Sequence, residues 1–294
     1  MAELRCGPSG WAYKDWEGRV YPRPHPRSFH PIEFLADRFD TIEIAQTFTD
    51  MVRPELAKLW VSKVDHNSRF KFTARLNRLF THERSLDSGE VKRFSEGLKP
   101  LTDQGRLGCV LMQFPYSFRY TEENKDFLIR LRRAFHHLPL VAELRHRTWA
   151  SDEGIGTLID YHVGYCNLDQ PQTVRAAGPS SFLTWRIGYV KLHGRVAGAV
   201  HEDFGRPEDD VAMEAAGKDY LYTLGELSDW KARIDRVARF SEQTYVVFAN
   251  HGLGRSVVNA MQMQGLVGAP APERRVASVA MIPPPLVTRA ATAA

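Results

Sequence analysis

Short apolar runs recur along the whole chain and alternate with segments whose apolar residues have helical spacing. Eight runs have the length and composition of β-strands, at residues 4–11, 41–48, 69–76, 107–114, 138–145, 164–169, 187–194 and 244–250. Seven segments between or after them have helical periodicity or helix-start signals, at residues 31–39, 54–64, 90–101, 122–135, 152–162, 224–240 and 254–263. Only residues 172–185, between the sixth and seventh runs, have little helical period.

Strands that are separated by helical crossovers pair in parallel, so this order predicts an α/β fold. Eight such units in one chain predict a single (β/α)8 barrel of the TIM type over residues 1–264. A doubly wound open sheet is the alternative, but the turn at residues 7–11 lacks the glycine spacing of a dinucleotide site.

Two segments fall outside the repeat. Residues 195–222 form a long polar insertion after the seventh strand, which we interpret either as a lid over one barrel mouth or as a floppy loop. Residues 265–294 are rich in Ala, Pro and Arg, which predicts a C-terminal tail that is mobile or loosely packed.

Composition narrows the class of protein. With 294 residues, of which 43% are hydrophobic, the chain can bury a full core without disulfides or metal staples. It has no apolar run long enough to span a membrane, and its first twenty residues lack the apolar core of a signal peptide, so we expect a cytoplasmic protein with no membrane partner. The three cysteines, Cys6, Cys109 and Cys166, lie far apart in apolar runs and are expected to be reduced core thiols. A net charge of +4 permits an anionic partner without requiring one.

Polar side chains gather late in the predicted strands. They are Glu43, Arg75, Gln113, Glu143, Arg145, Asn167, Asp169, Lys191, His193 and Asn250. Because buried polar groups without partners are costly, and because barrels carry their chemistry at the C-terminal mouth, we expect these residues to form a functional site there. An internal ion-pair network is the alternative, since three carboxylates and three cations cancel. The same cancellation disfavours a metal: no cofactor is expected, and a divalent cation is the minor alternative.

The loops after these strands mix aromatic with basic residues. Examples are Trp11, Tyr13, His82, Tyr116, Arg119, His146, Arg147, Trp149 and Arg195. Guanidinium groups bind phosphate or carboxylate, and flat aromatic rings stack on sugars or bases. The mixture therefore favours an anionic ligand that contains a ring.

Seven motifs, in this order, are GPSGWAYKDW, TIEIAQTF, RLFTHER, LMQFPYSFR, VAELRHRTW, VKLHGR and FAN. In this combination the chain resembles the YecE-like family, domain of unknown function 72, from about residue 5 to about residue 262. The resemblance implies a TIM-barrel-type fold and no established reaction. It marks as site residues Trp11, Tyr13, Glu43, His82, Gln113, Glu143, Arg145, His146, Trp149, Asp169, His193, Arg195 and Asn250. The chain departs from the family pattern at Pro8, Ala45, Arg75 and residues 251–252.

The leading hypothesis is an enzyme, of isomerase or hydrolase type, that acts by general acid/base chemistry on a small anionic ring-containing substrate such as a sugar phosphate or nucleotide. Arg145 would orient the substrate and keep Glu143 ionised, Glu43 or Asp169 would be the general base, and His193 would shuttle the proton. Arg75 and Arg195 would bind the anion, with further substrate contacts from Trp11, Tyr13, His82, Gln113, Arg145, His146, Trp149, Tyr220 and Asn250.

Two other classes stay open. A nucleic-acid-binding protein, or a repair-type nuclease, would read single-stranded or damaged DNA with the basic aromatic rim. A catalytically inactive scaffold would have its mouth residues bound only to one another. The sequence makes no prediction about the oligomeric state.

Overall fold

A computed structural model describes residues 3–171, 175–195 and 217–268 of the chain. Eight strands form one sheet in the order β1-β8-β7-β6-β5-β4-β3-β2, and all the paired neighbours are parallel. The strands are β1 (Glu3–Pro8), β2 (Thr41–Ile44), β3 (Lys71–Arg75), β4 (Leu107–Gln113), β5 (Leu140–Glu143), β6 (Gly164–Asp169), β7 (Ile187–Leu192) and β8 (Gln243–Phe248). The predicted TIM-type barrel is confirmed.

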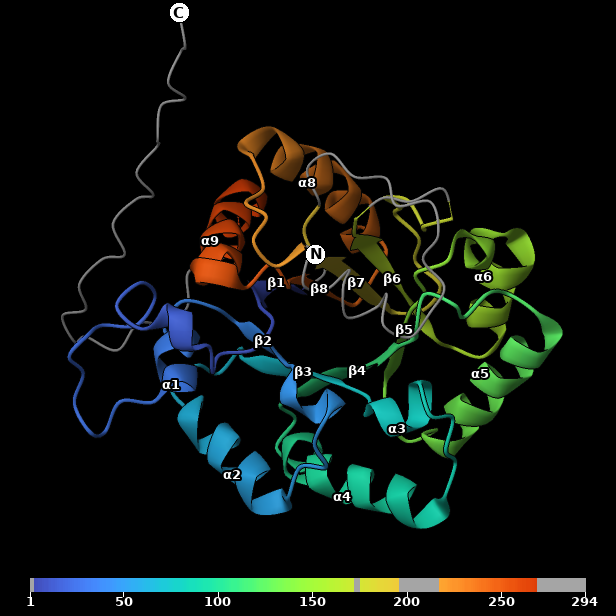
Figure 1. Cartoon of the computed structure of the whole chain (residues 1–294), viewed down its shortest axis with the longest axis horizontal. Helices are drawn as coiled ribbons and strands as arrows, with labels where there is room; N and C mark the ends of the chain where they lie inside the picture. The colour runs from blue at the N-terminus through green and yellow to red at the C-terminus, as the bar shows by residue number, and fades with distance from the viewer. Residues whose placement is uncertain (1–2, 172–174, 196–216, 269–294) are drawn as a thin grey trace, which may run out of the picture.

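Helices surround the strands (Figure 1). They are α1 (Pro31–Ala36), α2 (Pro54–Lys63), α3 (Arg78–Thr81), α4 (Ser88–Asp103), α5 (Glu122–Ala134), α6 (Asp152–Asp160), α8 (Leu224–Ala238) and α9 (Arg255–Val267), with short 3-10 turns η1 (Lys14–Trp16), η2 (Gln46–Phe48), η3 (Arg147–Ala150) and η4 (Gly252–Gly254). All seven predicted helices form, and local signals explain where several begin. Proline occupies the first position of α1 and α2, and Thr223 makes a capping box with Glu226 at α8.

The departures from the prediction are small. Helix α3 was not expected, because a four-residue helix is too short to show periodicity. Between β6 and β7 the described residues contain no helix, as the weak pattern there indicated. Helix α9 continues to Val267, three residues past the expected domain boundary, whereas the rest of the predicted tail and residues 196–216 of the insertion lie outside the described residues.

The barrel is nearly closed where β1 meets β2. Ser9 and Glu43 form a parallel bridge there, and the N–H of Gly10 donates to the carbonyl oxygen of Glu43 at 2.9 Å. Gly7 makes the approach possible, since a Cβ at this position would lie 1.9 Å from the carbonyl oxygen of Thr41. This contact joins β1 and β2, the two edge strands of the sheet, and so closes the sheet into a ring.

The side chains of the strands separate into two layers. One apolar cluster fills the barrel interior and contains Cys109, Leu111, Val141, Cys166, Leu168, Ile187, Tyr189, Tyr245 and Val247. A larger cluster lies between the strands and the helices. The three cysteines are buried and free, as expected. No helix in the described ranges has the length and apolarity needed to cross a membrane.

Candidate functional site

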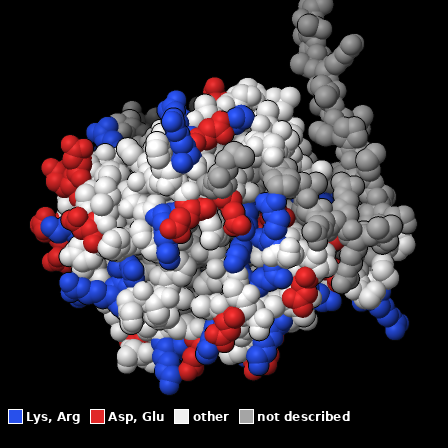
Figure 2. Space-filling model, turned by 180° about the vertical axis from the view of Figure 1, so that it is seen from behind, with Lys and Arg blue, Asp and Glu red and all other residues white. Residues whose placement is uncertain are grey.

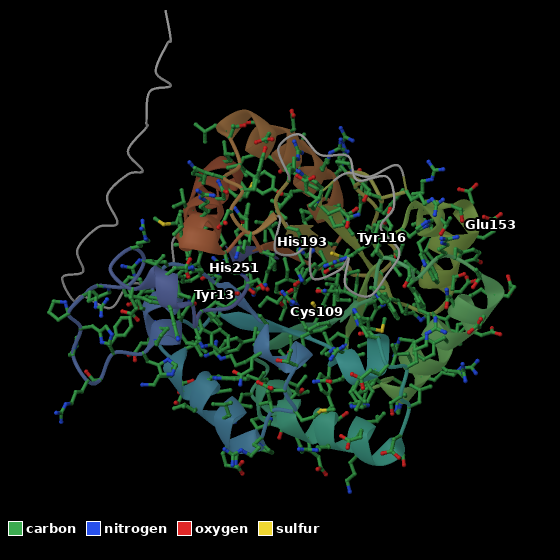
Figure 3. All side chains as sticks on the ribbon, in the orientation of Figure 1. Tyr13, Cys109, Tyr116, Glu153, His193 and His251 are labelled. Atoms are coloured by element: carbon green, nitrogen blue, oxygen red, sulfur yellow. The ribbon has the colours of Figure 1, made fainter. Side chains whose placement is uncertain are left out.

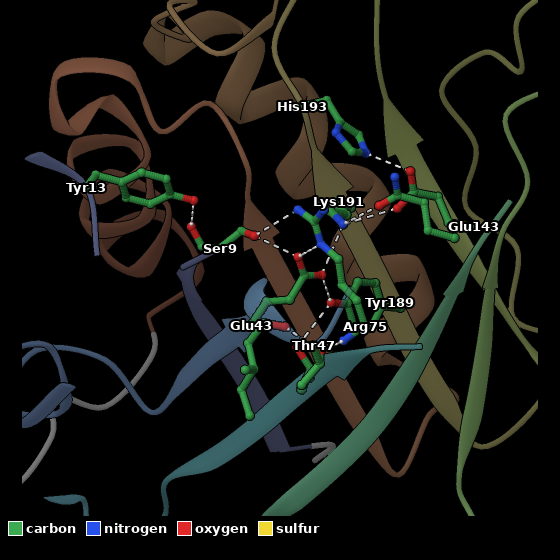
Figure 4. Close-up of polar contacts among 12 residues, drawn as sticks. Ser9, Tyr13, Glu43, Thr47, Arg75, Glu143, Tyr189, Lys191 and His193 are labelled. Atoms are coloured by element: carbon green, nitrogen blue, oxygen red, sulfur yellow. Dashed lines mark hydrogen bonds and ion pairs between the residues drawn. The ribbon is translucent and has the colours of Figure 1, made fainter. Parts of the chain in front are cut away.

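A fully buried lysine joins two carboxylates inside the barrel. Lys191 on β7 places its Nζ 3.1 Å from Oε2 of Glu43 and 3.2 Å from Oε2 of Glu143. The side-chain oxygen of Gln113 lies 3.5 Å from the same nitrogen. These residues belong to a connected group, called here the barrel network, whose members are Ser9, Glu43, Arg75, Gln113, Glu143, Arg145, Tyr189, Lys191 and His193. Figure 4 shows most of its contacts.

Glu43 is held by donors on both oxygens. Its Oε1 accepts from Ser9 Oγ at 2.7 Å and from Arg75 Nε at 2.8 Å, and its Oε2 accepts from the hydroxyl of Tyr189 at 2.8 Å. Burial by itself raises the pKa of this carboxyl, but the charges of Lys191 and Arg75 and these hydrogen bonds prevail and hold the pKa at about 2. Glu43 is therefore a fixed anion at neutral pH.

Glu143 forms a dyad with His193. His193 Nε2 lies 2.9 Å from Glu143 Oε1, and Arg145 Nε donates to the same oxygen at 3.0 Å. Burial opposes ionisation of Glu143, yet Lys191, His193 and Arg145 keep its pKa well below the usual value. Burial also lowers the pKa of His193, although Glu143 opposes this shift.

This arrangement sets the chemistry of the imidazole. A neutral ring beside a carboxylate carries its proton on the nitrogen that faces the carboxylate, so Nε2–H of His193 donates to Glu143. The other nitrogen, Nδ1, then has a lone pair. Among the described residues no hydrogen bond is made by Nδ1 of His193. The dyad can thus accept a proton at Nδ1, and the carboxylate of Glu143 stabilises the imidazolium that forms.

Asp169 lies outside the barrel network, which corrects the prediction that it faces the barrel opening with Glu43, Glu143 and His193. Strand β6 turns Cys166 and Leu168 inward, so Asn167 and Asp169 point to the helix side. Asp169 Oδ2 accepts from Arg195 Nε at 2.8 Å and from Trp230 Nε1 on α8 at 3.2 Å. Burial raises the pKa of Asp169, although Arg195 opposes the shift.

Three more predicted site residues, Arg195, Tyr220 and Asn250, also make their contacts on the helix side, near Asp169. Arg195 also donates to Glu226 at 2.8 Å, and the hydroxyl of Tyr220 donates to the same carboxylate. Asn250 likewise does not face the mouth, because its Nδ2 donates to the carbonyl oxygen of Tyr220 at 2.8 Å and to Asn259 on α9 at 2.9 Å. Two of the residues expected to contact substrate, Tyr220 and Asn250, thus hold the segment before α8.

Trp149 is a packing residue, contrary to its predicted place on an open rim. Its side chain is fully buried, its Nε1 donates to the carbonyl oxygen of Phe118 at 2.8 Å, and its ring stacks on the Phe118 ring at 5.4 Å. His82 is held by Thr81, whose hydroxyl lies 2.9 Å from Nδ1, and by the edge of the Phe48 ring.

A small cavity opens at the C-terminal ends of β1 and β2. Its volume is about 170 Å³, and it is lined by Gly10, Trp11, Ala12, Tyr13, Ala45 and Gln46. The hydroxyl of Tyr13 donates to the carbonyl oxygen of Ser9 at 3.0 Å, and its ring stacks on His251 at 4.2 Å (Figure 3). The cavity therefore adjoins the Ser9 end of the barrel network.

Three residues of this region were missed by the sequence analysis. Ser9 and Tyr189 both bond Glu43, and Gln46 lines the cavity. Alternation gave a signal for Tyr189, which lies two residues before Lys191 and so shares its face. Ser9 and Gln46 had no such signal, because they lie beyond the ends of β1 and β2, where the alternation of a strand no longer applies.

Other surfaces offer less. A groove of about 650 Å³ between α2 and α4 contains none of the predicted site residues. Within the described residues no three His, Cys, Asp or Glu side chains are grouped to hold a metal ion. Figure 2 shows acidic and basic side chains interspersed on the face opposite to Figure 1.

Comparison with known proteins gives a consistent family. The model of the family described as "Protein of unknown function DUF72" matches residues 5–281. The UPF0759 protein YunF of Bacillus subtilis is 24% identical over 277 residues, which cover 90% of this chain and 94% of YunF. A DUF72 family protein from Thermotoga maritima has a TM-score of 0.73 at 25% identity, covering 90% of this chain and 99% of its own. One from Enterococcus faecalis has a TM-score of 0.75 at 20% identity, covering 90% and 95%.

Proposed function

Because the chain belongs to the DUF72 family, a family of unknown function, we propose a function from the site itself: an enzyme that acts by general acid/base chemistry on a small anionic substrate containing a ring, such as a sugar phosphate or nucleotide. The observation that carries the proposal is the bond of 2.9 Å between His193 Nε2 and Glu143 Oε1. It lies at the C-terminal end of the strands, where barrels of this type carry out their chemistry.

The roles follow from the contacts. Nδ1 of His193 is the base that takes a proton from the substrate, and Glu143 fixes the tautomer and stabilises the imidazolium that forms. Glu43 is not the base, because a carboxylate with a pKa of about 2 holds a proton weakly at neutral pH. Its role is to hold Lys191 and Arg75 in position beside the dyad.

The cavity beside Ser9 supports a ring-containing substrate. Its volume of about 170 Å³ and its lining by Trp11 and Tyr13 suit one flat or sugar-sized ring. A nucleic-acid-binding protein is not favoured, because three aromatic rings of the rim predicted after β4 and β5 are packed inside and cannot stack on bases. Tyr116 and Phe118 are each 2% exposed and Trp149 is fully buried.

The test is a turnover screen with variants of the dyad. Purified protein is incubated with pentose phosphates, hexose phosphates and nucleoside monophosphates, and conversion is followed by proton and phosphorus NMR. His193→Gln and Glu143→Gln are expected to lower the rate by a factor of about 10²–10⁴, the usual contribution of general acid/base catalysis. His136→Gln, which changes an exposed histidine at the end of α5, is the matched control and should leave the rate unchanged.

Two results would overturn the proposal. One is the absence of conversion of every compound by the wild-type protein, and the other is undiminished turnover in His193→Gln. Circular dichroism and urea unfolding of each variant show whether a lost rate reflects lost fold. The lowered pKa of His193 further predicts that kcat/KM is already at its plateau at neutral pH and falls only in acid.

A further inference from the structure

Three arginine side chains lie at the C-terminal ends of three successive strands. Arg119 follows β4, Arg147 follows β5 and Arg175 follows β6; together they are called here the arginine cluster. Each side chain is exposed. Among the described parts of the chain none of the three guanidinium groups makes a hydrogen bond or an ion pair. The arginines first expected to bind an anion are different, since Arg75 and Arg195 are paired with carboxylates.

Backbone contacts hold these three loops together. The N–H of Arg147 donates to the carbonyl oxygen of Arg175 at 2.9 Å, and His146 pairs with Ala176 in an antiparallel bridge. The loop after β4 is tied to the same place, because the N–H of Tyr120 donates to Thr148 Oγ1 at 2.8 Å. The arginine cluster is thus the product of three linked loops and not of one flexible segment.

His146 adds a buried donor that has no partner within residues 3–171, 175–195 and 217–268. Nδ1 of His146 accepts from the N–H of Thr148 at 3.3 Å and lies 3.0 Å from Thr148 Oγ1, a hydroxyl that can also donate to it. With Nδ1 as the acceptor, the neutral ring carries its proton on Nε2. That nitrogen is buried, in a residue that is 5% exposed, and it makes no hydrogen bond to any residue that the structure describes. A buried N–H without an acceptor is unfavourable, and such groups in folded proteins are usually satisfied.

The surroundings of His146 are positively charged. Burial and then the charges of Arg119, Arg175 and Arg147 lower the pKa of the imidazole to about 4, with no opposing carboxylate. The Tyr116 ring contacts the imidazole with its edge, at 5.7 Å between centroids. An acceptor of negative charge would satisfy the N–H and offset the repulsion among the cations.

We propose that the arginine cluster and Nε2–H of His146 bind a phosphate group, either free phosphate or the monoester end of a small organic ligand. Guanidinium groups bind phosphate oxygens in bidentate fashion, and three cations with one N–H donor suit a dianion with three terminal oxygens better than a carboxylate. Because Nε2 is covered in this structure, a bound phosphate requires a small movement of the side chains around it. If the proposed function holds, the phosphate bound here is the anionic end of the same substrate. Only this identification of the ligand rests on the proposed function.

Binding of inorganic phosphate at low ionic strength tests the site without any need for turnover. Isothermal titration should show saturable binding to the wild-type protein. Arg147→Gln and Arg175→Gln should each weaken binding by at least about tenfold, because hydrogen bonds to charged groups are the strong ones. Arg130→Gln, which removes an exposed arginine further along α5, is the matched control and should leave the affinity within about twofold.

A second measurement reports on His146 itself. Nitrogen-15 NMR of the imidazole should show Nε2 shifting with phosphate, and the pKa of His146 should rise when phosphate is bound, because an anion favours the charged ring. His146→Gln should weaken phosphate binding while urea unfolding shows a folded protein. Titrations with ribose 5-phosphate and with ribose distinguish the two sources: tighter binding of the ester than of free phosphate identifies an organic ligand, and equal binding identifies free phosphate.

The result that overturns the site is clear. It is wrong if the wild-type protein shows no saturable phosphate binding, or if Arg147→Gln and Arg175→Gln change the affinity no more than Arg130→Gln does. The proposed function is tested separately, because undiminished turnover in His193→Gln would overturn it whatever the phosphate titrations show.

Discussion

Removing the charge of Lys191 is the sharpest test of the barrel network. Lys191→Met keeps the length of the side chain and deletes an ammonium group that lies 3.1 Å from Glu43 and 3.2 Å from Glu143 in a fully buried position. Breaking a buried ion pair on one side typically costs about 3–5 kcal/mol, because a charge is left without its partner. Each carboxylate keeps other donors, Arg75 for Glu43 and Arg145 for Glu143, so we expect about 3 kcal/mol.

The assay is urea unfolding followed by circular dichroism. If the free energy of unfolding falls by about 3 kcal/mol for each molar of urea, this loss moves the unfolding midpoint down by about 1 M. Lys99→Met is the matched control, since Lys99 pairs with Asp103 at 2.7 Å but is 66% exposed. Exposed pairs of this kind contribute less than about 1 kcal/mol.

A double variant separates the contribution of the ion pair from the contribution of side-chain packing. Lys191→Met together with Glu43→Gln removes both members of one pair, so the double variant should lose less than the sum of the two single losses. Equal midpoints for Lys191→Met and Lys99→Met would refute the reasoning, because they would mean that the buried charges do not stabilise one another.

Three further predictions concern the same framework. The pKa of Glu43, about 2 in the folded protein against 4.5 in the unfolded chain, means that stability is present above pH 4.5 and is lost as the pH falls toward 2; Glu43→Gln should flatten this part of a urea-midpoint profile. Gly7→Ala should lower the thermal midpoint, or prevent folding, because its Cβ would meet the Thr41 carbonyl; an unchanged midpoint would contradict the closure argument. Asp169→Asn should cost less in urea unfolding than Lys191→Met, because burial already favours the neutral form of Asp169; a larger loss would count against this.

The direction of the charged side chains at the strand ends was predicted correctly where the alternation of apolar and polar residues showed which face of the strand is which. Glu43 and Glu143 meet at Lys191, and His193 contacts Glu143, because each lies on a face that alternation identified. Asp169 was placed on the wrong face. A shift of one residue in register reverses the direction of every side chain on a strand, and β6 is apolar on one face and polar on the other, which leaves its direction open to misreading.

The burial of the aromatic side chains in the loops could not be predicted from the sequence, because it depends on contacts between different loops. Trp149 and Phe118 belong to different loops, after β5 and β4, and their stacking became apparent only when those loops were brought together. The sequence around a loop tryptophan does not show whether its side chain packs on a neighbour or faces solvent. The sequence also did not show that the arginine cluster has no partner in the described part of the chain, since ion pairing depends on which carboxylates come within reach.

The sequence by itself determined the number and order of the strands and helices, because apolar periodicity and capping residues act over a few neighbouring positions. It also determined that charged residues collect at the C-terminal ends of the strands. Only the tertiary structure decided which of them interact: closing the barrel brings β2, β5 and β7 around Lys191 and turns Asp169 outward to α8. The physical reason is that hydrogen bonds and ion pairs require approach within a few ångströms between residues far apart in the chain, and this approach is set by strand register and barrel closure.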